Sequence, residues 1–283
     1  MFGFQRIHDL AWAAGDAQAK GFLIGATSGR TTLNGEGLQH QDGHSHVLSS
    51  TIPNCLSYDP AYAYELAIIF KDGIQKMFVE QQNYYYYITV TNENYEQPEQ
   101  PKGIEKDVIK GLYKVSSCTN PQIRLLGSGA ILKESIAAQE VLKKYSINAE
   151  VWSATSFNLL RKDGMEAERY NQLNPHKEKH TTHIDKCFGE HAIPVIATTD
   201  YMRAYADQIR PYIYSSYSVL GTDGFGRSDS REELREFFEI NTNHIVRLTA
   251  FTLYKESTIS KKQLDEIYKD LKVDPTKPNP WEV

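Results

Sequence analysis

The sequence is poor in the residues that build disulfide frameworks and zinc clusters. Its 283 residues include three cysteines, at positions 55, 118 and 187, with no CxxC pair and no Cys/His finger spacing. An odd and sparse set of cysteines argues against a disulfide framework and fits a reducing compartment. We therefore expect an intracellular, cytoplasmic protein.

Long stretches of a single character are also missing. No apolar run approaches the roughly 20 residues that a membrane helix needs, and the first residues, MFGFQRIHDLAWAAGD, lack the pattern of a signal peptide. The net charge is −5 and no long basic run occurs, which argues against nucleic acid as a partner. We expect a soluble chain with neither a membrane nor a nucleic-acid partner, long enough for two domains.

The first part of the chain alternates apolar segments with one long polar loop. Apolar residues recur at helical spacing from Phe2 onwards without a preceding cap, as if the helix were cut from a longer chain. We expect buried strands at residues 22–26, 56–58 and 84–90, and a helix that starts at Asp59-Pro60 and runs to about Glu80. Residues 92–103 hold two prolines and little apolar character. They are interpreted as a linker or, equally well, as a surface loop.

The second part of the chain predicts alternating strands and helices. We expect strands at residues 122–126, 149–154, 194–197 and 217–220, and helices at residues 132–145, 157–171, 201–209, 243–254 and 261–271. In the helix expected at residues 132–145, the residues expected to face inward are Ile136, Ala137, Val141 and Leu142. Such alternation implies an α/β fold with a largely parallel sheet covered on both faces. The proline-rich tail, DPTKPNPWEV, is expected to be an extended strap.

One loop, residues 27–46, gathers most of the chemistry, and we call it the histidine loop. It combines Glu36, His40, Asp42, His44 and His46 with several glycines. Histidine exchanges protons near neutral pH and a nearby carboxylate tunes it; Glu36 and His40 would share a face if the segment turned helically. A solvated loop without a chemical role is the plainer interpretation. Zinc ligation by the alternating histidines is a further alternative, but no HExxH pair or cysteine set supports it, and we assign no metal ligand.

Two other segments invite a functional interpretation. GTDGFGRSDSR, residues 221–231, follows a predicted strand, where ligands bind in open α/β sheets, but it lacks the Walker lysine and the GxGxxG spacing. A strand-to-helix turn with Asp223 and Ser230 as caps is favoured, with Glu233 completing a capping box at Ser230. The tyrosines at 84–87 could stack bases or sugars, but a buried strand or a subunit interface suits them better.

Several long segments resemble one enzyme family in the same order along the chain. They are MFGFQRIHDLAWAAGD, GFLIGATSGRTTLNGEGLQHQDGHSH, TIPNCLSYDPAYAYELA, YYYYITVTNENY, LLGSGAIL, TTDYM and VLGTDGFGRSDSR. The family is the homodimeric bacterial pyruvate dehydrogenase decarboxylating component (acetyl-transferring). The resemblance implies a transketolase-like fold, with the later part of the pyrimidine-binding middle domain at residues 1–103 and the C-terminal α/β domain at residues 104–283.

The resemblance also implies an activity and site residues. Enzymes of this family use thiamine diphosphate to decarboxylate pyruvate and pass the acetyl group to lipoyl-lysine of the dihydrolipoyl acetyltransferase. By resemblance, His40 positions or protonates the bound substrate and intermediate, and Glu36 lines the active-site channel. Phe2 falls where the family packs an aromatic ring beside the cofactor's aminopyrimidine. No role carries over to His44, His46 or Asp223.

The family's cofactor-binding signature is missing from this sequence. Members hold magnesium and the diphosphate through a Gly-Asp-Gly motif and paired asparagines. Asp-Gly occurs here at Asp42, Asp72, Asp163 and Asp223, never as Gly-Asp-Gly, and no other oxygen-rich magnesium set is visible. We expect a fragment that is inactive without the part carrying these groups. A non-catalytic dimerising module, a metalloenzyme using the histidine loop, and another thiamine enzyme such as a transketolase are the alternatives.

Overall fold

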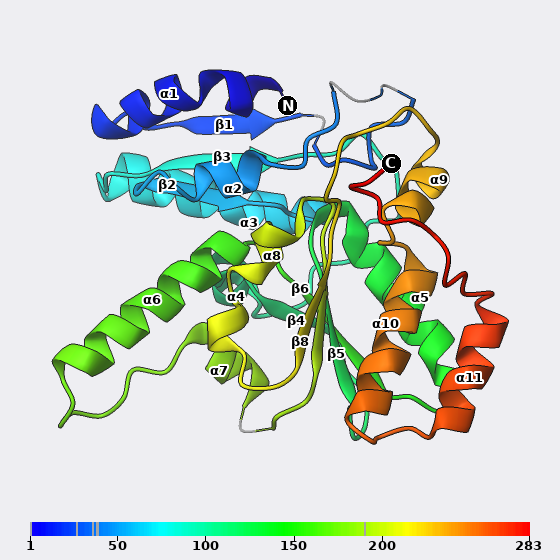
Figure 1. Cartoon of the computed structure of the whole chain (residues 1–283). Helices are drawn as coiled ribbons and strands as arrows, with labels where there is room; N and C mark the ends of the chain where they lie inside the picture. Colours follow the sequence, from blue (N-terminus) through cyan, green and yellow to red (C-terminus); the bar gives the residue numbers. More distant parts are fainter. Residues whose placement is uncertain (1, 27, 36, 38–39, 190) are drawn as a thin grey trace.

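The computed structural model describes residues 2–26, 28–35, 37, 40–189 and 191–283, with the backbone alone at residues 2 and 3. Two β-sheets, one formed by strands between residues 22 and 89 and the other by strands between residues 113 and 220, stand side by side with helices around them (Figure 1). The strands of both sheets are mostly parallel, as the sequence predicts. No helix among the described residues has both the length and the apolar character to cross a membrane.

The first sheet has three parallel strands with the tyrosine-rich strand in the centre. Its order is β1 (Phe22–Gly25), β3 (Tyr85–Thr89), β2 (Cys55–Tyr58). Every residue of β3 is buried, because aromatic and β-branched side chains fill both faces of a central strand. The strand predicted at residues 22–26 is confirmed as β1, but its predicted burial is wrong, since β1 pairs with β3 on one side only in the described part and Ile24 is 46% exposed.

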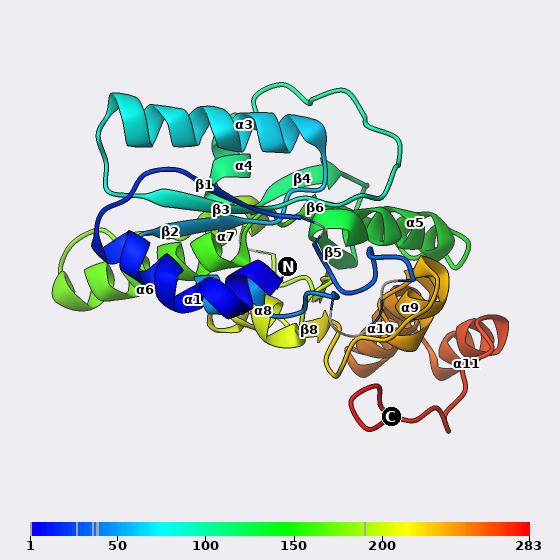
Figure 2. The same cartoon turned by 90° about the horizontal axis from the view of Figure 1, so that it is seen from above.

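Helices cover both faces of the first sheet (Figure 2). They are α1 (Phe2–Asp16), α2 (Ser45–Ser49), α3 (Ala63–Ile74) and the π-helical turn η1 (Gln75–Val79). The predicted helix start at Asp59-Pro60 is wrong. The helix begins at Ala63, because Glu65 folds back and accepts the backbone N–H groups of Ala61 and Tyr62, which is the carboxylate half of a capping box. The N-terminal helix is confirmed, although only part of its apolar stripe is buried: Phe4 and Ala11 are inside and Leu10 is exposed.

The second sheet has five strands in the order β4-β6-β5-β7-β8. Their bounds are β4 (Tyr113–Ser116), β5 (Ile123–Gly127), β6 (Ala149–Ser153), β7 (Val195–Thr198) and β8 (Tyr217–Leu220). Four strands run parallel, and β4 pairs antiparallel with β6 at the edge. The largely parallel sheet is therefore confirmed.

Helices pack on both faces of the second sheet (Figure 1). One face carries α5 (Leu132–Lys143), α10 (Thr242–Lys255) and α11 (Lys261–Asp270), and the other carries α6 (Phe157–Leu173), α7 (His183–Phe188) and α8 (Arg203–Asp207). Short helices η2 (Gly129–Ile131), η3 (Arg210–Tyr212), α4 (Glu105–Lys110) and α9 (Arg231–Phe237) complete the fold. The inward face predicted for α5 is wrong at Ala137, which is exposed, whereas its neighbour Ala138 is buried.

A buried ion pair lies within the second sheet. Arg124 Nε lies 2.7 Å from Glu150 Oε1, and these residues sit opposite each other on β5 and β6. The guanidinium also donates to the carbonyls of Phe188 and His191. A buried charge is tolerated only when its hydrogen bonds are satisfied, so this arginine fastens the sheet to the end of α7.

The connection between the two sheets is irregular. Residues 90–101 form neither helix nor strand. The proposed boundary between residues 103 and 104 stays a prediction. The proline-rich tail after α11 also lacks regular structure and packs against the turn at Gly224, where a Cβ would lie 2.9 Å from Pro280 O.

Candidate functional site

The histidine loop lies where the strands of both sheets end. Ser28 N donates to Val90 O, just beyond β3, and Arg30 N donates to Asp200 O, just beyond β7, at 3.0 and 3.1 Å. Seen from above, the loop crosses from the first sheet toward α9 (Figure 2). The carboxyl ends of parallel strands are the usual ligand-binding edge of α/β sheets. The loop therefore occupies the position in the fold that is best suited to a site.

His40 is half-buried and lies in the second half of the histidine loop. Its backbone N–H donates to Gly37 O at 3.2 Å, in a turn rather than a helix. The next residue, Gln41, is buried and exchanges two hydrogen bonds with the backbone of Arg227, at 2.7 and 2.9 Å. His40 is thus flanked by a residue fixed to the second half of the chain.

Two predicted site residues fall outside the described part. Glu36 is outside the described residues, and so is the side chain of Phe2, whose backbone begins α1. The predicted pairing of Glu36 with His40 on one helical face therefore stays a prediction. The described neighbour Phe4 packs its ring 4.6 Å from that of Tyr87, and Gln5 Nε2 lies 2.9 Å from His44 Nδ1. The first turns of α1 therefore contact both β3 and the histidine loop.

The other polar residues of the loop have separate partners. Asp42 accepts hydrogen bonds from the backbone N–H groups of His44 and Ser45, each at 3.0 Å, and so starts α2. His46 Nε2 lies 2.9 Å from Thr89 Oγ1. Among the described residues, no three His, Cys, Asp or Glu side chains are placed to share a metal ion. The zinc alternative thus finds no support in the described part of the loop.

Burial shifts the titration of several groups around the loop. Burial lowers the pKa of His46 to about 3 and raises the pKa of Asp59 to about 7, against hydrogen bonds from Thr89 and Ser128. Burial also raises the pKa of Asp200, against the charge of Arg235 and hydrogen bonds from Thr31 and Thr32. At neutral pH, His46 is therefore a neutral, structural histidine.

The segment 221–231 forms the strand-to-helix turn that its sequence predicts, but with different caps. Ser230 Oγ accepts the Glu233 N–H at the start of α9, as expected. The second half of the predicted capping box is wrong, because Ser230 N donates to Asp229 Oδ1 instead. Asp223 Oδ2 accepts the N–H and the Nε–H of Arg203, so it caps α8 and not α9.

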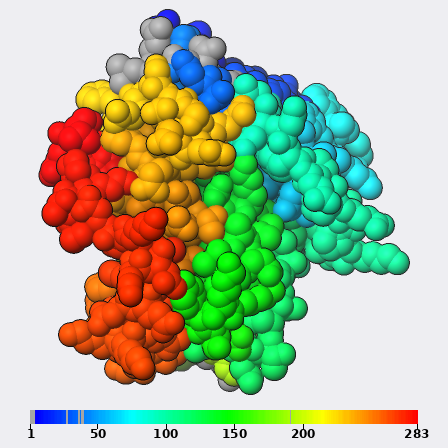
Figure 3. Space-filling view, turned by 90° about the vertical axis from the view of Figure 1, so that its right-hand side faces the viewer, coloured from blue at the N-terminus to red at the C-terminus, as the bar shows by residue number. Residues whose placement is uncertain are grey.

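The same segment also lies along the histidine loop (Figure 3). Gly35 N donates to Asp229 O at 3.0 Å, and the Arg30 guanidinium donates to Gly224 O. Arg30 is 2% exposed. The sequence did not predict this contact, since no pattern in the histidine loop or in residues 221–231 indicates that the two segments lie side by side.

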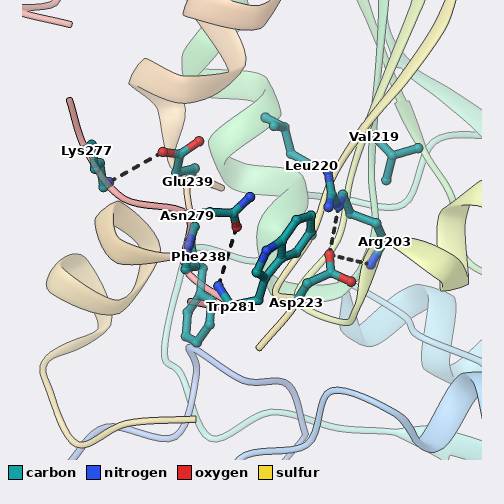
Figure 4. Close-up of a pocket in the computed structure, with 11 residues that line it drawn as sticks. Arg203, Val219, Leu220, Asp223, Phe238, Glu239, Lys277, Asn279 and Trp281 are labelled. Atoms are coloured by element: carbon teal, nitrogen blue, oxygen red, sulfur yellow. Dashed lines mark hydrogen bonds and ion pairs between the residues drawn. The ribbon is translucent and has the colours of Figure 1, made fainter. Parts of the chain in front are cut away.

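A cavity of about 260 Å³ opens beside this segment, under the C-terminal tail (Figure 4). Arg203 and Asp223 lie on one side, and Lys277, Asn279 and Trp281 of the tail on the other. The charges are already paired, since Arg203 binds Asp223 and Lys277 lies 3.9 Å from Glu239. His40 does not line this cavity, and we do not assign it as the site.

The tyrosine-rich strand is not a stacking platform. Tyr85 OH donates to Ala11 O at 3.0 Å, and Tyr86 OH donates to Asp72 Oδ2 at 2.6 Å. Tyr87 packs against Phe4 and His46. These three tyrosines are buried, so their aromatic rings build the core and present no face to a base or a sugar.

Comparisons with known proteins match the whole chain to one enzyme. Residues 1–98 match the model of the pyruvate dehydrogenase E1 component middle domain, and residues 111–241 match that of the transketolase-like C-terminal domain. The pyruvate dehydrogenase E1 component of Pseudomonas aeruginosa is 53% identical over 99% of this chain, and that of Cupriavidus necator is 50% identical over 100%. The chain belongs to the pyruvate dehydrogenase E1 family. It corresponds to a C-terminal portion of these proteins and spans about a third of their length, 32% in both cases.

Solved structures support the fold of this pyruvate dehydrogenase E1 portion. Transketolase from Campylobacter jejuni superposes with a TM-score of 0.65 at 18% identity, covering 87% of this chain and 34% of the transketolase. Transketolase from Leishmania mexicana gives a TM-score of 0.60 at 17% identity, covering 81% and 30%. At such identities the likeness concerns the fold alone. The transketolase-like architecture expected from the sequence is confirmed.

Proposed function

We propose that this chain forms the substrate-facing part of a thiamine-diphosphate-dependent pyruvate dehydrogenase. In this proposal the enzyme decarboxylates pyruvate and transfers the acetyl group to the lipoyl domain of dihydrolipoyl acetyltransferase. The observation that carries the proposal is sequence identity of 50–53% to pyruvate dehydrogenase E1 components along the entire chain. The position of the histidine loop at the carboxyl ends of two parallel sheets supports it.

His40 is the proposed proton-handling residue. Thiamine diphosphate, when bound, would supply a nucleophilic carbon and an electron sink for the decarboxylation. The protein has to place the substrate and exchange protons with it, and an imidazole does this near neutral pH. We assign that role to His40, the channel lining to Glu36, and the contact with the cofactor's aminopyrimidine ring to Phe2.

The described residues do not themselves fit magnesium diphosphate. None of their His, Cys, Asp and Glu side chains gather in threes to hold a metal ion, and Gly-Asp-Gly does not occur in the sequence. Magnesium prefers carboxylates together with phosphate oxygens. We therefore assign magnesium and the diphosphate to the part of the enzyme that lies outside the matched third.

The assembly follows from the same proposal. Residues 1–103 belong to the middle, pyrimidine-binding domain and residues 104–283 to the C-terminal domain. The complete enzyme is a cytoplasmic homodimer. The free cysteines of the described part are compatible with a reducing compartment.

A chimeric enzyme tests the proposal. The matching third of the Pseudomonas aeruginosa relative is replaced by this chain, and pyruvate decarboxylation is measured with thiamine diphosphate and magnesium. We expect an active chimera, because half of the positions are identical along the whole chain. A folded chimera that binds the cofactor and leaves pyruvate untouched contradicts the proposal.

Substitution of His40 in the chimera tests the role of the loop. We expect His40→Ala to slow acetyl transfer by about a hundredfold to ten-thousandfold, the range for loss of a general acid or base, while cofactor binding survives. His176→Ala, which removes an exposed histidine on the connection after α6, is the matched control. Equal turnover of the two variants removes His40 from the site.

Calorimetry on the 283-residue chain tests whether the magnesium and diphosphate site lies outside this chain. We expect no tight, magnesium-dependent binding of thiamine diphosphate by this chain alone, and binding by the chimera. Tight binding by the chain alone shows that the diphosphate site lies within it.

A further inference from the structure

One buried carboxylate, that of Asp200, contacts the base of the histidine loop in addition to the backbone hydrogen bonds of Ser28 and Arg30. Asp200, directly after β7, is 2% exposed. Its Oδ1 accepts the Thr31 N–H at 3.0 Å and the Thr31 hydroxyl at 2.7 Å, and its Oδ2 lies 3.1 Å from the Thr32 hydroxyl. Buried hydrogen bonds to a charged acceptor are among the stronger ones in proteins. The Thr32 hydroxyl also donates to Ser28 O. Asp200 thus fixes Thr31 to the second sheet by two hydrogen bonds and contacts Thr32 beside it.

The backbone of the histidine loop comes very close to the Asp200 carboxylate at Gly29. A Cβ on Gly29 would lie 2.1 Å from Asp200 Oδ2, and Gly29 has φ +85°. Only glycine allows the backbone to come so near in this conformation. Arg235 Nε donates to the Thr31 hydroxyl at 3.2 Å, and its guanidinium is paired with Glu93. The threonine hydroxyl therefore has both a donor and an acceptor fixed around it.

The loop is fastened to the same half of the chain again, closer to His40. Gly35 N donates to Asp229 O, and Gln41 exchanges two hydrogen bonds with the backbone of Arg227. A Cβ on Gly37 would lie 2.3 Å from Ser228 Oγ. The described loop residues on both sides of position 36 thus follow a surface made by the second half of the chain. The Asp200 contacts set where that path begins.

We infer that Asp200 is a positioning residue for His40, acting through Thr31 and Thr32. The C-terminal domain then contributes to catalysis by shaping the loop of the middle domain, without itself touching the substrate. The contribution of Asp200 to catalysis rests on the proposed function. The contacts of Asp200 with Thr31 and Thr32, which we call the Asp200 clamp, do not depend on it. A catalytic loop needs such support, because small displacements of a catalytic group cost large factors in rate.

Three variants of the 283-residue chain test the clamp. Asp200→Ala removes all the side-chain contacts and keeps the backbone hydrogen bond to Arg30 N, and Thr31→Val removes the hydroxyl with almost no change in shape. Asp200→Asn is the conservative variant, since its carbonyl oxygen still accepts from Thr31 and its amide faces Thr32 Oγ1. Thr249→Val is the matched control, because it alters a fully buried threonine in α10 whose hydroxyl has no hydrogen-bond partner among the described residues.

Hydrogen–deuterium exchange gives the first measurement. In Asp200→Ala and Thr31→Val we expect exchange in peptides covering residues 28–35 and 40–46 to quicken by about tenfold to a hundredfold, as for loss of one strong buried hydrogen bond. Exchange in the β5–β7 core should stay at the wild-type rate. Unchanged loop exchange in Thr31→Val overturns the inference, and equal acceleration of loop and core does so too, because it reports general destabilisation. If Asp200→Ala does not fold, the Thr31→Val result decides.

The side-chain resonance of His40 gives the second measurement. In protein with labelled histidines, we expect the His40 signal to move or broaden in Thr31→Val and Asp200→Ala, and to return toward the wild-type position in Asp200→Asn. The signals of His183 and His244, which lie elsewhere in the second half of the chain, should not change. A His40 resonance with the same position and width in all three variants as in the wild type contradicts a positioning role. Neither measurement involves cofactor or turnover, so failure of the clamp is distinct from failure of the chimera.

Discussion

The imidazole Nε2 of His46 lies 2.9 Å from the hydroxyl of Thr89, and this contact joins α2 to the end of the central strand of the first sheet. The same hydroxyl lies 2.7 Å from Asp59 Oδ1. The His46 ring stacks on Tyr205 of α8 with centroids 4.7 Å apart. A buried histidine and a buried carboxyl therefore meet through one threonine where the two halves of the chain pack together.

His46 makes the folded chain sensitive to acid. Its pKa falls from 6.5 in the unfolded chain to about 3 when buried. Below about pH 6.5 the His46 imidazole therefore binds a proton in the unfolded chain and stays unprotonated in the folded chain. The free energy of unfolding drops as the pH falls through this range. From pH 7.5 to pH 5 this amounts to roughly 2 kcal/mol. His46→Phe keeps an aromatic ring against Tyr205 and should lack this loss.

Urea denaturation at the two pH values measures the effect. We expect the stability gap between the wild type and His46→Phe to move by about 2 kcal/mol in favour of the variant on going from pH 7.5 to pH 5. His176→Phe, at an exposed position, is the control for adding a phenylalanine. A gap that is the same at both pH values shows that the buried imidazole takes up its proton while folded.

Asp59 produces the opposite dependence. Burial raises its pKa from 3.8 to about 7, so the folded state keeps a proton that the unfolded chain has released. The free energy of unfolding contributed in this way is complete below about pH 4 and is lost as the pH rises toward 7. Asp59→Asn keeps an acceptor for Thr89 and does not ionise. Relative to the wild type, we expect it to gain about 3 kcal/mol between pH 5 and pH 8.

The comparison requires a second carboxyl variant. Asp265→Asn removes an exposed carboxylate from α11 and serves as the control in the same denaturation series. A pH-independent difference between Asp59→Asn and the wild type would mean that Asp59 is ionised throughout this range, with solvent or another cation compensating for its burial.

Much of the fold follows from local patterns in the sequence. The strands β2, β3 and β5–β8 were predictable because each belongs to a short, largely apolar or aromatic run, several of them bounded by turn residues. The helices α6, α10 and α11 were predictable from their apolar periodicity, and their caps at Ser156, Asn241 and Ser260 bear this out. Burial was harder to predict. The edge position of β1 depends on which strands pair, and pairing is not encoded within the strand itself.

The site was predictable as a segment and not as a set of contacts. The density of histidine, glycine and carboxylate marked the histidine loop, and its resemblance to one family named His40. The clamp at Asp200 and the contact between Gln41 and Arg227 span more than 150 residues of sequence. Each partner looks locally like an ordinary strand end or turn. The partners meet because β7 and β8 run parallel, so that the segments after both strands lie at the same edge of the second sheet, next to the histidine loop.

Gly43 gives a prediction about the packing of the loop itself. A Cβ at this position would lie 2.0 Å from Arg30 Nη2 and 2.6 Å from Arg30 Cζ. The guanidinium is buried and its Nη1 donates to Gly224 O, so it has little room to move. Overpacking of a filled site costs about 1–3 kcal/mol, and we expect Gly43→Ala to lower the free energy of unfolding by that amount.

A double-mutant cycle identifies the cause. Gly21→Ala is the control, because no atom of the described residues lies within 4 Å of its Cβ position, and it should be neutral or slightly stabilising. Arg30→Met removes the group that occupies the Cβ position of residue 43, so in that background Gly43→Ala should cost much less. The coupling is then the difference between the two costs, measured by urea denaturation. An equal loss in both backgrounds would place the strain in the backbone of the loop rather than in its contact with Arg30.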